Sequence, residues 1–503
     1  MGISLIFASS EAAPYSKTGG LGDVAGALPA ALSRLGCDVS LFLPLYRETR
    51  LKHIEIESTG TRIVVPLGRR MIRAEVFRAP RGPVKTFFIS CDEFYDRSFL
   101  YGPPEGDYFD NLERFTLFSR AMLEAVSALG LDIDVLHAND WQTGLLPLYI
   151  KNLYRGEERF QSTATLFTIH NSAFQGLFPA DDYSLLGLSH RLFTPAGLEF
   201  WGKISLLKAG LVSADIVTTV SPGYCREIKT ARYGYGLEGL YKERKKDLYG
   251  VINGVDYSEW DPAIDPLLPA QYSPYDMTGK GECRKALLRT FGLKALESTA
   301  VVGMVTRLTG QKGIDIVIRA LPELMKLDMT LVIVGTGDKE IEARLRKVSE
   351  KFQGRVGLKI AFDNTLAHLV EAGSDIFLMP SQYEPCGLNQ IYSQKYGTIP
   401  VVRATGGLDD TVRDYTAEKN PTGFKFKRFA APALATALGR AVEVFKDRKK
   451  WAELQQNAMR EDFSWEVSAR RYMELYGLAM ERQGLGRDMR GKKVRMAKKA
   501  KKS

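Results

Sequence analysis

Short apolar runs alternate with amphipathic stretches along the first 250 residues. The runs at Ile3–Ala8, Asp38–Pro44 and Thr165–Ile169 are rich in Leu, Ile, Val and Phe, as strands covered on both faces are. In Asn111–Leu129, by contrast, apolar residues recur at helical spacing. The alternation predicts an α/β fold in which helices cover a parallel sheet.

Two further stretches of the first half have predictions of their own. β-branched and aromatic runs within Lys52–Ile89 predict a small antiparallel excursion. Phe200–Ala214 carries Lys203 and Lys208 and is predicted to be one helix.

The alternation starts again in the second half of the chain. A helix is predicted at Cys283–Phe291, and strands follow from Ala300–Thr306 to Ile399–Arg403. A long terminal helix is predicted at Trp465–Arg482. No internal sequence repeat links the two halves, which share only the alternating plan.

The junction between the halves has the composition of a hinge. Ile252–Asp256 contains Asn-Gly, which tolerates left-handed backbone angles, and Asp261–Met277 is rich in proline. We therefore predict two doubly wound, Rossmann-like domains, at residues 1–252 and 253–464, facing each other across a deep cleft.

Basic residues are concentrated at the C-terminus. The net charge of +10 includes +8 from Arg487–Ser503, which leaves about +2 for the body, so no specific nucleic-acid partner is indicated. We predict that residues 465–484 hold the terminal helix and that 485–503 form a disordered basic tail. Weak binding of the tail to polyanions is the alternative.

Cysteine usage and the N-terminus bear on the compartment. The five cysteines are scattered and lack disulfide or metal-site spacing, so we expect free thiols in a reducing compartment. The first residues run into a strand pattern without a basic leader, and no window approaches ~18 uninterrupted apolar residues. We expect a cytoplasmic protein without a membrane partner.

The stretch Ser10–Pro29 connects the first strand to the first helix and carries the first candidate site. Lys17 is followed by Gly19 and Gly20, whose missing Cβ atoms let backbone amides approach an anion at the helix start. The spacing fits neither a dinucleotide fingerprint nor a P-loop, in which the lysine follows the glycines. We expect a phosphate or a sugar here. A glycine-rich connector with a solvated lysine is the alternative.

Three later strands end in comparable polar corners, where folds of this class bind ligands. Arg307 and Lys312 lie on one strand-to-helix loop and could converge on a single diphosphate. His170 follows Thr165–Ile169 as a candidate sugar contact. Asp140 ends another strand, where it could accept sugar hydroxyls, orient a cation or cap the next helix.

A metal is not expected at this site. Asp132 and Asp134 have the D-x-D spacing of metal-dependent glycosyltransferases, but they precede their strand instead of following it. Gly406 and Gly407 open a further helix, and their amides, with the two cations, could stabilise a departing diphosphate without a metal.

The stretch Lys17–Val24, KTGGLGDV, resembles the N-terminal signature of glycogen and starch synthases, the retaining glucosyltransferases that extend α-1,4-glucans. Six further stretches resemble the family in the same order, and the likeness spans residues 1 to about 480. These stretches are His137–Gly144, Thr168–Pro179, Ile252–Asp256, Arg307–Gly313, Ser381–Leu388 and Thr405–Val412.

The resemblance implies the GT-B fold, no cofactor, an ADP-glucose donor, and glycogen or another α-1,4-glucan as acceptor. It also implies that the terminal helix crosses back to the N-terminal domain. The catalytic residues that it implies are His170, Asp140, Glu384, Arg307 and Lys312. The substrate-binding residues that it implies are Lys17, Gly19, Gly20, Asp23, Asn253, Gly387, Leu388, Thr405, Gly406 and Gly407.

The resemblance also bears on mechanism. Many retaining relatives carry a second Glu eight positions after the residue matching Glu384, but that position here is Tyr392. A mechanism with two carboxylates is therefore not favoured, and we expect same-face attack by the acceptor 4-hydroxyl with the departing phosphate as base. Because Lys17 and Arg307 lie in different halves, the domains are expected to close over the donor.

Other functions remain open at this point. The enzyme alternatives are a UDP-glucose-dependent transferase, a transferase with another acceptor, and a glucan phosphorylase, which would need pyridoxal phosphate. A non-catalytic nucleotide-sugar or glucan-binding protein is the alternative from another class. The motifs do not identify the donor base, the oligomeric state or any regulation.

Overall fold

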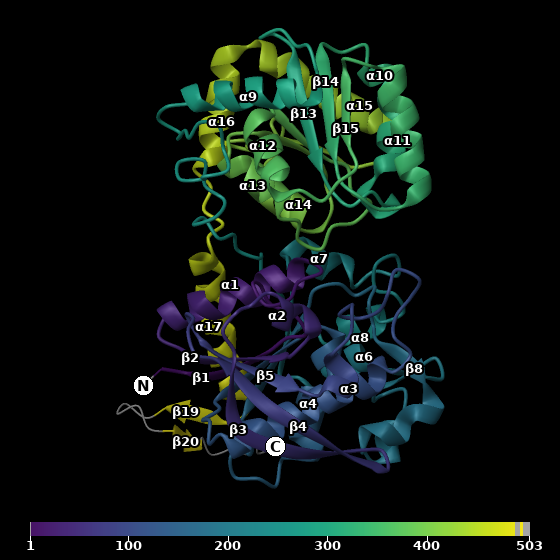
Figure 1. Cartoon of the computed structure of the whole chain (residues 1–503), viewed down its shortest axis with the longest axis vertical. Coiled ribbons are helices and arrows are strands. Elements are labelled where there is room, and N and C mark those ends of the chain that lie inside the picture. Colours follow the sequence, from purple (N-terminus) through teal and green to yellow (C-terminus); the bar gives the residue numbers. More distant parts are fainter. Residues whose placement is uncertain (1, 488–492, 496–503) are drawn as a thin grey trace, which may run out of the picture. The chain divides into compact units, whose positions relative to one another are not determined.

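The computed structural model describes residues 2–487 and 493–495. The chain forms two compact units. The first comprises residues 1–220, 225–254 and the chain from 465 onward, and the second comprises 221–224 and 255–464. Each unit has its own sheet, mostly parallel in the first and entirely parallel in the second, with helices on both faces (Figure 1).

Nine strands form the sheet of the first unit, in the order β12-β11-β7-β6-β1-β2-β5-β4-β3. Their bounds are β1 (Ser4–Ala8), β2 (Asp38–Pro44), β3 (Glu57–Leu67), β4 (Arg70–Ala79), β5 (Lys85–Ser90), β6 (Val135–Asn139), β7 (Ala164–Ile169), β11 (Ile216–Thr219) and β12 (Leu248–Gly250). Neighbours are parallel from β12 to β5, whereas β4 is antiparallel to both β5 and β3. The predicted antiparallel excursion is therefore an extension of the main sheet.

The helices of the first unit form two layers. Helices α1 and α17 pack on each other over one face, and Leu5 and Phe7 of β1 join them in a buried cluster. Helices α4, α5 and α6 contact β3 to β7 as the other layer. The helix bounds are α1 (Gly20–Arg34), α2 (Arg47–Leu51), α3 (Asp92–Tyr95), α4 (Asn111–Ala128), α5 (Leu145–Asn152), α6 (Leu206–Ser213), α8 (Glu238–Glu243) and α17 (Trp465–Arg482), with 3₁₀ turns η1 (Trp141–Thr143), η2 (Ala180–Leu186) and η3 (His190–Leu192).

The helix predicted at Phe200–Ala214 is wrong in its first half. Strands β9 (Glu199–Phe200) and β10 (Lys203–Ser205) form a hairpin there, and β8 (Leu177–Pro179) pairs with β10. The hairpin tip has φ near +75° at Gly202, which a right-handed helix cannot include. Helix α6 starts only at Leu206, where the Ser205 hydroxyl accepts the N–H of Lys208 at 3.2 Å.

Six strands form the sheet of the second unit, in the order β15-β14-β13-β16-β17-β18, and all neighbours are parallel (Figure 1). Their bounds are β13 (Ala300–Val305), β14 (Met329–Val334), β15 (Val356–Lys359), β16 (Ile376–Met379), β17 (Ile399–Arg403) and β18 (Phe424–Phe426). Along β13 and β14 successive side chains enter different cores: Val302 packs with α10, α11, α15 and α16, whereas Val301 packs with α9 and α12. This explains why these strands are apolar at nearly every position.

The helices of the second unit follow the predicted alternation. Their bounds are α9 (Thr278–Phe291), α10 (Ile314–Leu324), α11 (Lys339–Lys351), α12 (Asn364–Gly373), α13 (Asn389–Lys395), α14 (Gly406–Thr411), α15 (Ala431–Lys446) and α16 (Arg448–Met459), with a 3₁₀ turn η4 (Gly310–Lys312). Helix α7 (Pro222–Glu227) spans a division between the units.

The proline-rich stretch that follows residue 255 is anchored on the second unit. Asp265 is buried, and its carboxylate accepts from the Tyr396 hydroxyl at 2.6 Å and contacts His368 Nδ1 at 2.7 Å. Trp260 stacks between the rings of His368 and Tyr392, with centroid separations of 3.8 and 3.9 Å. The stretch is therefore a packed part of this unit.

Helix α17 is anchored in the first unit by apolar and polar contacts. Tyr476 is fully buried, and its hydroxyl lies 2.8 Å from Nδ1 of His137 in β6. The other ring nitrogen of His137 contacts the Thr168 hydroxyl at 2.7 Å. Burial lowers the pKa of His137 well below its usual value, so the ring is neutral and both of its nitrogens are satisfied by neutral partners.

Three sequence expectations concern the ends and the surface. The basic tail at 485–503 lies mostly outside the described residues; within it, β19 (Leu485–Arg487) and β20 (Lys493–Arg495) pair antiparallel. The five cysteines are free thiols, as expected. Across the described residues, no helix is both long and apolar enough to span a bilayer.

We expect Tyr476→Phe to destabilise the first unit. The substitution keeps the ring but removes the hydroxyl partner of the buried His137 nitrogen, and such an unsatisfied group costs about 1–3 kcal/mol. Scanning calorimetry should show a lower melting temperature. Glu474→Gln, on the exposed side of the same helix, is the matched control and should melt like the unmodified chain. Equal melting of both variants would contradict the anchoring role.

Candidate active site

The strand order of each sheet locates a candidate site. In doubly wound sheets, ligands bind outside the carboxyl ends of the strands, where the order reverses. The reversal lies between β1 and β6 in the first unit and between β13 and β16 in the second. The loops that leave these four strands carry Lys17, Asp140, Lys312 and Glu384, all of which were predicted from the sequence.

The loop after β1 is built over a buried carboxyl group. Glu11 accepts hydrogen bonds from the backbone N–H and, at 2.9 Å, the hydroxyl of Thr18. Burial raises the pKa of Glu11 to about 7 against the effect of these donors. Glu11 is not among the residues predicted from the sequence. Its one signal is a carboxylate three residues after a buried strand, ahead of the glycines.

Lys17 lies on the surface of the same loop. Its ammonium pairs with Asp23, in the first turn of α1. A Cβ on Gly22 would lie 2.9 Å from Cγ of Lys17, so this glycine lets the lysine stem lie against the helix. Among the described residues, and apart from the adjoining backbone, no atom lies within 4 Å of the Cβ position of Gly20, and Gly19 meets only the far end of Glu11. The helix start is therefore open beside Lys17.

The loops after β6 and β7 meet around His170. Its Nε2 lies 3.0 Å from Oδ1 of Asn139, and the Asn139 amide nitrogen donates to the carbonyl of Ala8 at 3.1 Å. Because the second bond fixes the amide orientation, His170 donates through Nε2 and keeps Nδ1 as an acceptor. Burial lowers the pKa of His170 to about 3, so the ring is neutral at pH 7. Asn139 was missed by the sequence analysis.

Asp140 holds the His170 loop in place. It has a left-handed backbone, with φ near +55°, and its carboxylate accepts the N–H of His170 at 2.7 Å. Although Asp140 precedes η1, its side chain does not cap that turn, so the capping alternative is not what the structure shows. Burial raises the pKa of Asp140 to about 7, while the N–H groups of His170 and Asn171 oppose the rise.

The second unit brings Lys312 and Glu384 together. The Lys312 ammonium lies 2.6 Å from Oε2 of Glu384, which also accepts the Ser381 hydroxyl at 3.0 Å. Glu384 is buried and Lys312 is half-buried. A buried ion pair of this kind has a fixed geometry because breaking it would leave an uncompensated charge.

The two loops that carry this pair are locked to each other. The Gln382 N–H donates to the carbonyl of Gln311 at 2.7 Å. Gly313 has φ near +74°, and a Cβ there would lie 2.2 Å from the carbonyl oxygen of Pro380. Glycine is therefore required where the loops touch. Arg307, on the same loop as Lys312, is exposed.

Helix α14 packs against the Glu384 loop through its two glycines. A Cβ on Gly406 would lie 2.0 Å from the carbonyl oxygen of Glu384, and one on Gly407 would lie 2.1 Å from that of Cys386. The Gly407 N–H donates to the carbonyls of Glu384 and Pro385. That amide therefore holds the loop, and the expectation that it faces a phosphate is not met in this structure. Thr405 is buried before the helix.

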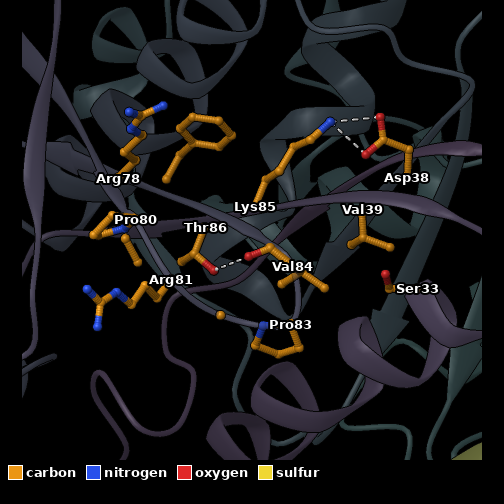
Figure 2. Close-up of a pocket in the computed structure, with 13 residues that line it drawn as sticks. Ser33, Asp38, Val39, Arg78, Pro80, Arg81, Pro83, Val84, Lys85 and Thr86 are labelled. Atoms are coloured by element: carbon orange, nitrogen blue, oxygen red, sulfur yellow. Dashed lines mark hydrogen bonds and ion pairs between the residues drawn. The ribbon is translucent and has the colours of Figure 1, made fainter.

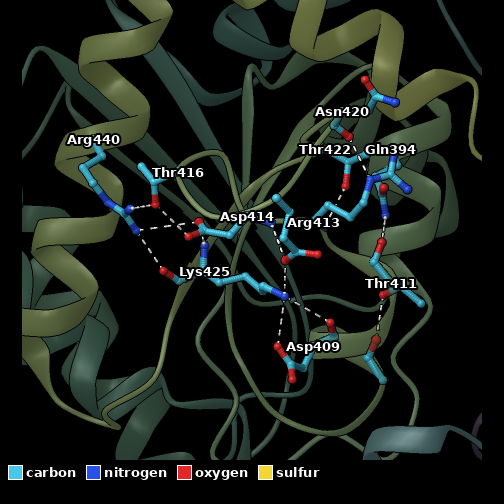
Figure 3. A network of polar contacts seen from close by, with 12 residues as sticks. Gln394, Asp409, Thr411, Arg413, Asp414, Thr416, Asn420, Thr422, Lys425 and Arg440 are labelled. Carbon is cyan, nitrogen blue, oxygen red and sulfur yellow. Dashed lines mark hydrogen bonds and ion pairs between the residues drawn. The ribbon is translucent and has the colours of Figure 1, made fainter.

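A polar network holds the end of α14 (Figure 3). Lys425 pairs with Asp409 at 3.0 Å and also donates to its carbonyl, which places a cation at the C-terminal end of the helix. Gln394 donates to the carbonyl of Thr411 at 3.2 Å. These contacts position α14 against the loop that carries Glu384.

Three predicted residues remain to be placed. Gly387 has φ near +74°, and Leu388 precedes α13. In the first unit, Asn253 is buried and its Oδ1 has no hydrogen-bond partner among the described residues. A buried acceptor without a partner is unusual, and a bound hydroxyl would satisfy it.

Neither the D-x-D pair nor the cavity in Figure 2 coincides with this site. Asp134 accepts the N–H of Ser4 at 2.9 Å, and the described residues include no cluster of three or more His, Cys, Asp or Glu arranged for a metal. A cavity of about 530 Å³ lies at the amino ends of β2 and β5, where Lys85 pairs with Asp38 at 2.7 Å. It is at the sheet edge opposite to His170.

Comparison with known proteins agrees with the fold. Residues 4–243 match the family model of the starch synthase catalytic domain, and 291–458 match that of glycosyl transferases group 1. The catalytic domain of starch synthase IV from Arabidopsis thaliana, solved with ADP and acarbose, is 32% identical with a TM-score of 0.87, over 96% of this chain and all of that one.

Two bacterial relatives align over nearly their full length. A glycogen synthase from Koribacter versatilis is 44% identical over 480 residues, covering 95% of this chain and 98% of that one. A glycogen synthase from Syntrophotalea carbinolica is 42% identical over 482 residues, covering 95% and 99%. Two parallel sheets, the two strand-order reversals and these matches lead to one conclusion: the chain is a GT-B glycosyltransferase and belongs to the glycogen and starch synthase family.

Proposed function

We propose that this chain transfers glucose from ADP-glucose to the 4-hydroxyl at the non-reducing end of an α-1,4-glucan, with retention of configuration and release of ADP. The observation that carries the proposal is the buried pair of Lys312 and Glu384 at the strand-order reversal of the second unit. The ADP in the Arabidopsis structure supports this donor, and the relatives' names support the acceptor. The cytoplasmic location expected from the sequence stays a prediction.

Lys312 and Arg307 are proposed to hold the diphosphate. As the bond between glucose and phosphate breaks, negative charge grows on the leaving group, so cations fixed beside it favour the transition state over the ground state. The contact with Glu384 keeps the Lys312 ammonium in one orientation before the donor binds. Arg307 is exposed on the same loop. Lys17 is proposed to contact the same donor.

The polar groups of the first unit are proposed to orient glucose. His170 is neutral, and its Nδ1 can accept a sugar hydroxyl while Nε2 remains bonded to Asn139. The orphan Oδ1 of Asn253 is a second acceptor. The ionised form of Asp140 supplies further lone pairs beside the His170 loop.

The proposed chemistry needs no protein nucleophile. The acceptor 4-hydroxyl oxygen bonds to the anomeric carbon on the face from which the diphosphate leaves, and its proton passes to the departing phosphate oxygen. Glu384 accepts from both Lys312 and Ser381, which suits a carboxylate that binds and orients better than one that attacks. Same-face attack therefore remains our proposal.

The direct test is transfer of radiolabelled glucose from ADP-glucose or UDP-glucose to glycogen, with release of the nucleoside diphosphate measured in parallel. We expect incorporation from ADP-glucose and much less from UDP-glucose. A preference for UDP-glucose would overturn the donor assignment. No incorporation from either donor, with donor binding intact, would favour a non-catalytic binding protein.

Lys312→Met should lower kcat by about 10²–10³-fold, the usual effect of removing one preorganised group that stabilises developing charge. The variant keeps the length of the side chain and removes the ammonium. Steady-state kinetics with varied ADP-glucose at saturating glycogen would measure the change.

The matched control is Lys326→Met, which breaks an exposed pair with Glu323 on the same unit. Its kcat should equal that of the unmodified chain, since exposed pairs contribute little. An unchanged kcat in Lys312→Met would remove Lys312 from the diphosphate site.

Activity should rise with pH through neutrality. Because burial holds the pKa of Asp140 at about 7, the carboxyl group is protonated at pH 6 and mostly ionised at pH 8. The ionised form is the better acceptor for the His170 and Asn171 N–H groups and for a glucan hydroxyl. We expect kcat/KM for glycogen to rise between about pH 6 and pH 8, and Asp140→Asn to be less active and to lose this rise.

The free energy of unfolding should fall as pH rises, in the opposite direction to activity. In the unfolded chain an Asp ionises near pH 3.9, so between about pH 4 and 7 the folded chain keeps a proton that the unfolded chain releases. Stability therefore falls as pH rises through this window, by roughly 1–3 kcal/mol between pH 5 and 8. Melting curves of Asp140→Asn should depend less on pH. Activity and stability that rise together would contradict the assignment.

A further inference from the structure

Two exposed aromatic residues of the first unit occupy an unusual backbone conformation. Trp201 is 83% exposed with φ near +52°, and Tyr235 is 38% exposed with φ near +51°. Each is followed by a glycine with positive φ, Gly202 at +75° and Gly236 at +86°. Trp201 and Tyr235 therefore form two tight turns of the same kind, with an aromatic ring at each tip.

Trp and Tyr are both unfavourable residue types at positions with positive φ. Large side chains rarely adopt φ above zero, and such outliers persist only where the surrounding structure enforces them, which occurs most often at functional sites. Among the described non-glycine residues, five have positive φ, and one of the others is Asp140, in the proposed active site. An exposed tryptophan also leaves a large apolar surface in water.

The two turns lie against each other. A Cβ on Gly236 would be 2.8 Å from Cζ of Phe200 and 3.5 Å from Nε1 of Trp201. The rings of Phe200 and Trp201 meet edge to face, with centroids 6.3 Å apart. The absence of a side chain at Gly236 thus lets the Trp201 hairpin and the Tyr235 turn pack together.

Both turns are joined to the loop that carries His170. The Trp201 hairpin pairs through β10 with β8, which starts directly after Gly176. The side-chain amide of the buried Gln175 donates to the carbonyl of Tyr235 at 2.9 Å. The aromatic turns and the His170 loop therefore form one continuous structure within the first unit.

We propose that Trp201 and Tyr235 form a platform on which an α-1,4-glucan acceptor binds next to the His170 loop. This inference rests on the proposed function for its ligand. The C–H face of a glucose ring can lie on a flat aromatic ring, and the indole N–H of Trp201 can donate to a sugar hydroxyl at its edge. A rigid platform suits a flexible polysaccharide because little of the protein must be ordered on binding.

Because Trp201 has an unfavourable backbone conformation, a substitution there can remove the ring without destabilising the fold. Asn tolerates positive φ, so Trp201→Asn removes the ring while suiting the backbone. We expect its melting temperature to be unchanged or higher. We also expect about a 3- to 10-fold higher KM for glycogen, a smaller effect on kcat, and weaker retardation in native gels that contain glycogen. Trp201→Phe should restore part of the binding.

The control is Tyr275→Asn, at a 96% exposed position in a turn of the second unit, which should match the unmodified chain in every measurement. Glycogen affinity and KM that do not change in Trp201→Asn would overturn the platform while leaving the proposed function intact. Trp201-dependent retardation in a chain that transfers no glucose would support the platform and reject the proposed function. A lower melting temperature of Trp201→Asn with unchanged glycogen binding would show that the ring serves packing. A dimer in size-exclusion chromatography that depends on Trp201 would show that the ring contacts a second copy of the chain. Either outcome would also overturn the platform.

Discussion

The reversal of strand order beside β1 in the first unit and beside β13 in the second is the constraint on which the candidate residues of each unit depend. At each reversal, the connections to the next helices leave in opposite directions, so the carboxyl ends of two neighbouring strands are left uncovered. In the first unit this brings the Glu11–Lys17 loop next to Asp140, and in the second it brings Lys312 next to Glu384. The chemistry-bearing residues are far apart in sequence and close in space for this single topological reason.

Burial then determines the ionisation states at these strand ends. Glu11 and Asp140 are buried, which raises their pKa values to about 7, whereas burial lowers the pKa of His170 and keeps its ring neutral. Each is held by hydrogen bonds of fixed orientation, so these three side chains are neutral or only partly ionised near pH 7. In the second unit a buried carboxylate fixes an ammonium. The first arrangement suits sugar hydroxyls and the second suits phosphate, which matches the division of roles proposed for the two units.

Close backbone contacts keep these loops in position. Gly313, Gly406 and Gly407 are required because carbonyl oxygens of other loops lie within 2.0–2.2 Å of the positions that their Cβ atoms would occupy. The sequence predicts that the Gly407 amide binds a ligand, whereas in the structure this amide donates to the carbonyls of Glu384 and Pro385. Glycine clusters at strand ends therefore serve two purposes, and only the fold separates them.

The sequence by itself determined the α/β class and the strands whose loops carry the candidate residues. These follow from local properties: apolar runs for doubly covered strands, helical periodicity, and motif residues such as Lys17, Arg307 and His170. Only the tertiary structure decided that β5 continues the main sheet, that residues 199–205 form a hairpin instead of a helix, and that Glu11 and Asn139 belong to the site. The physical reason is that strand pairing, burial and hydrogen bonding join residues distant in the chain, and a local pattern does not specify those partners.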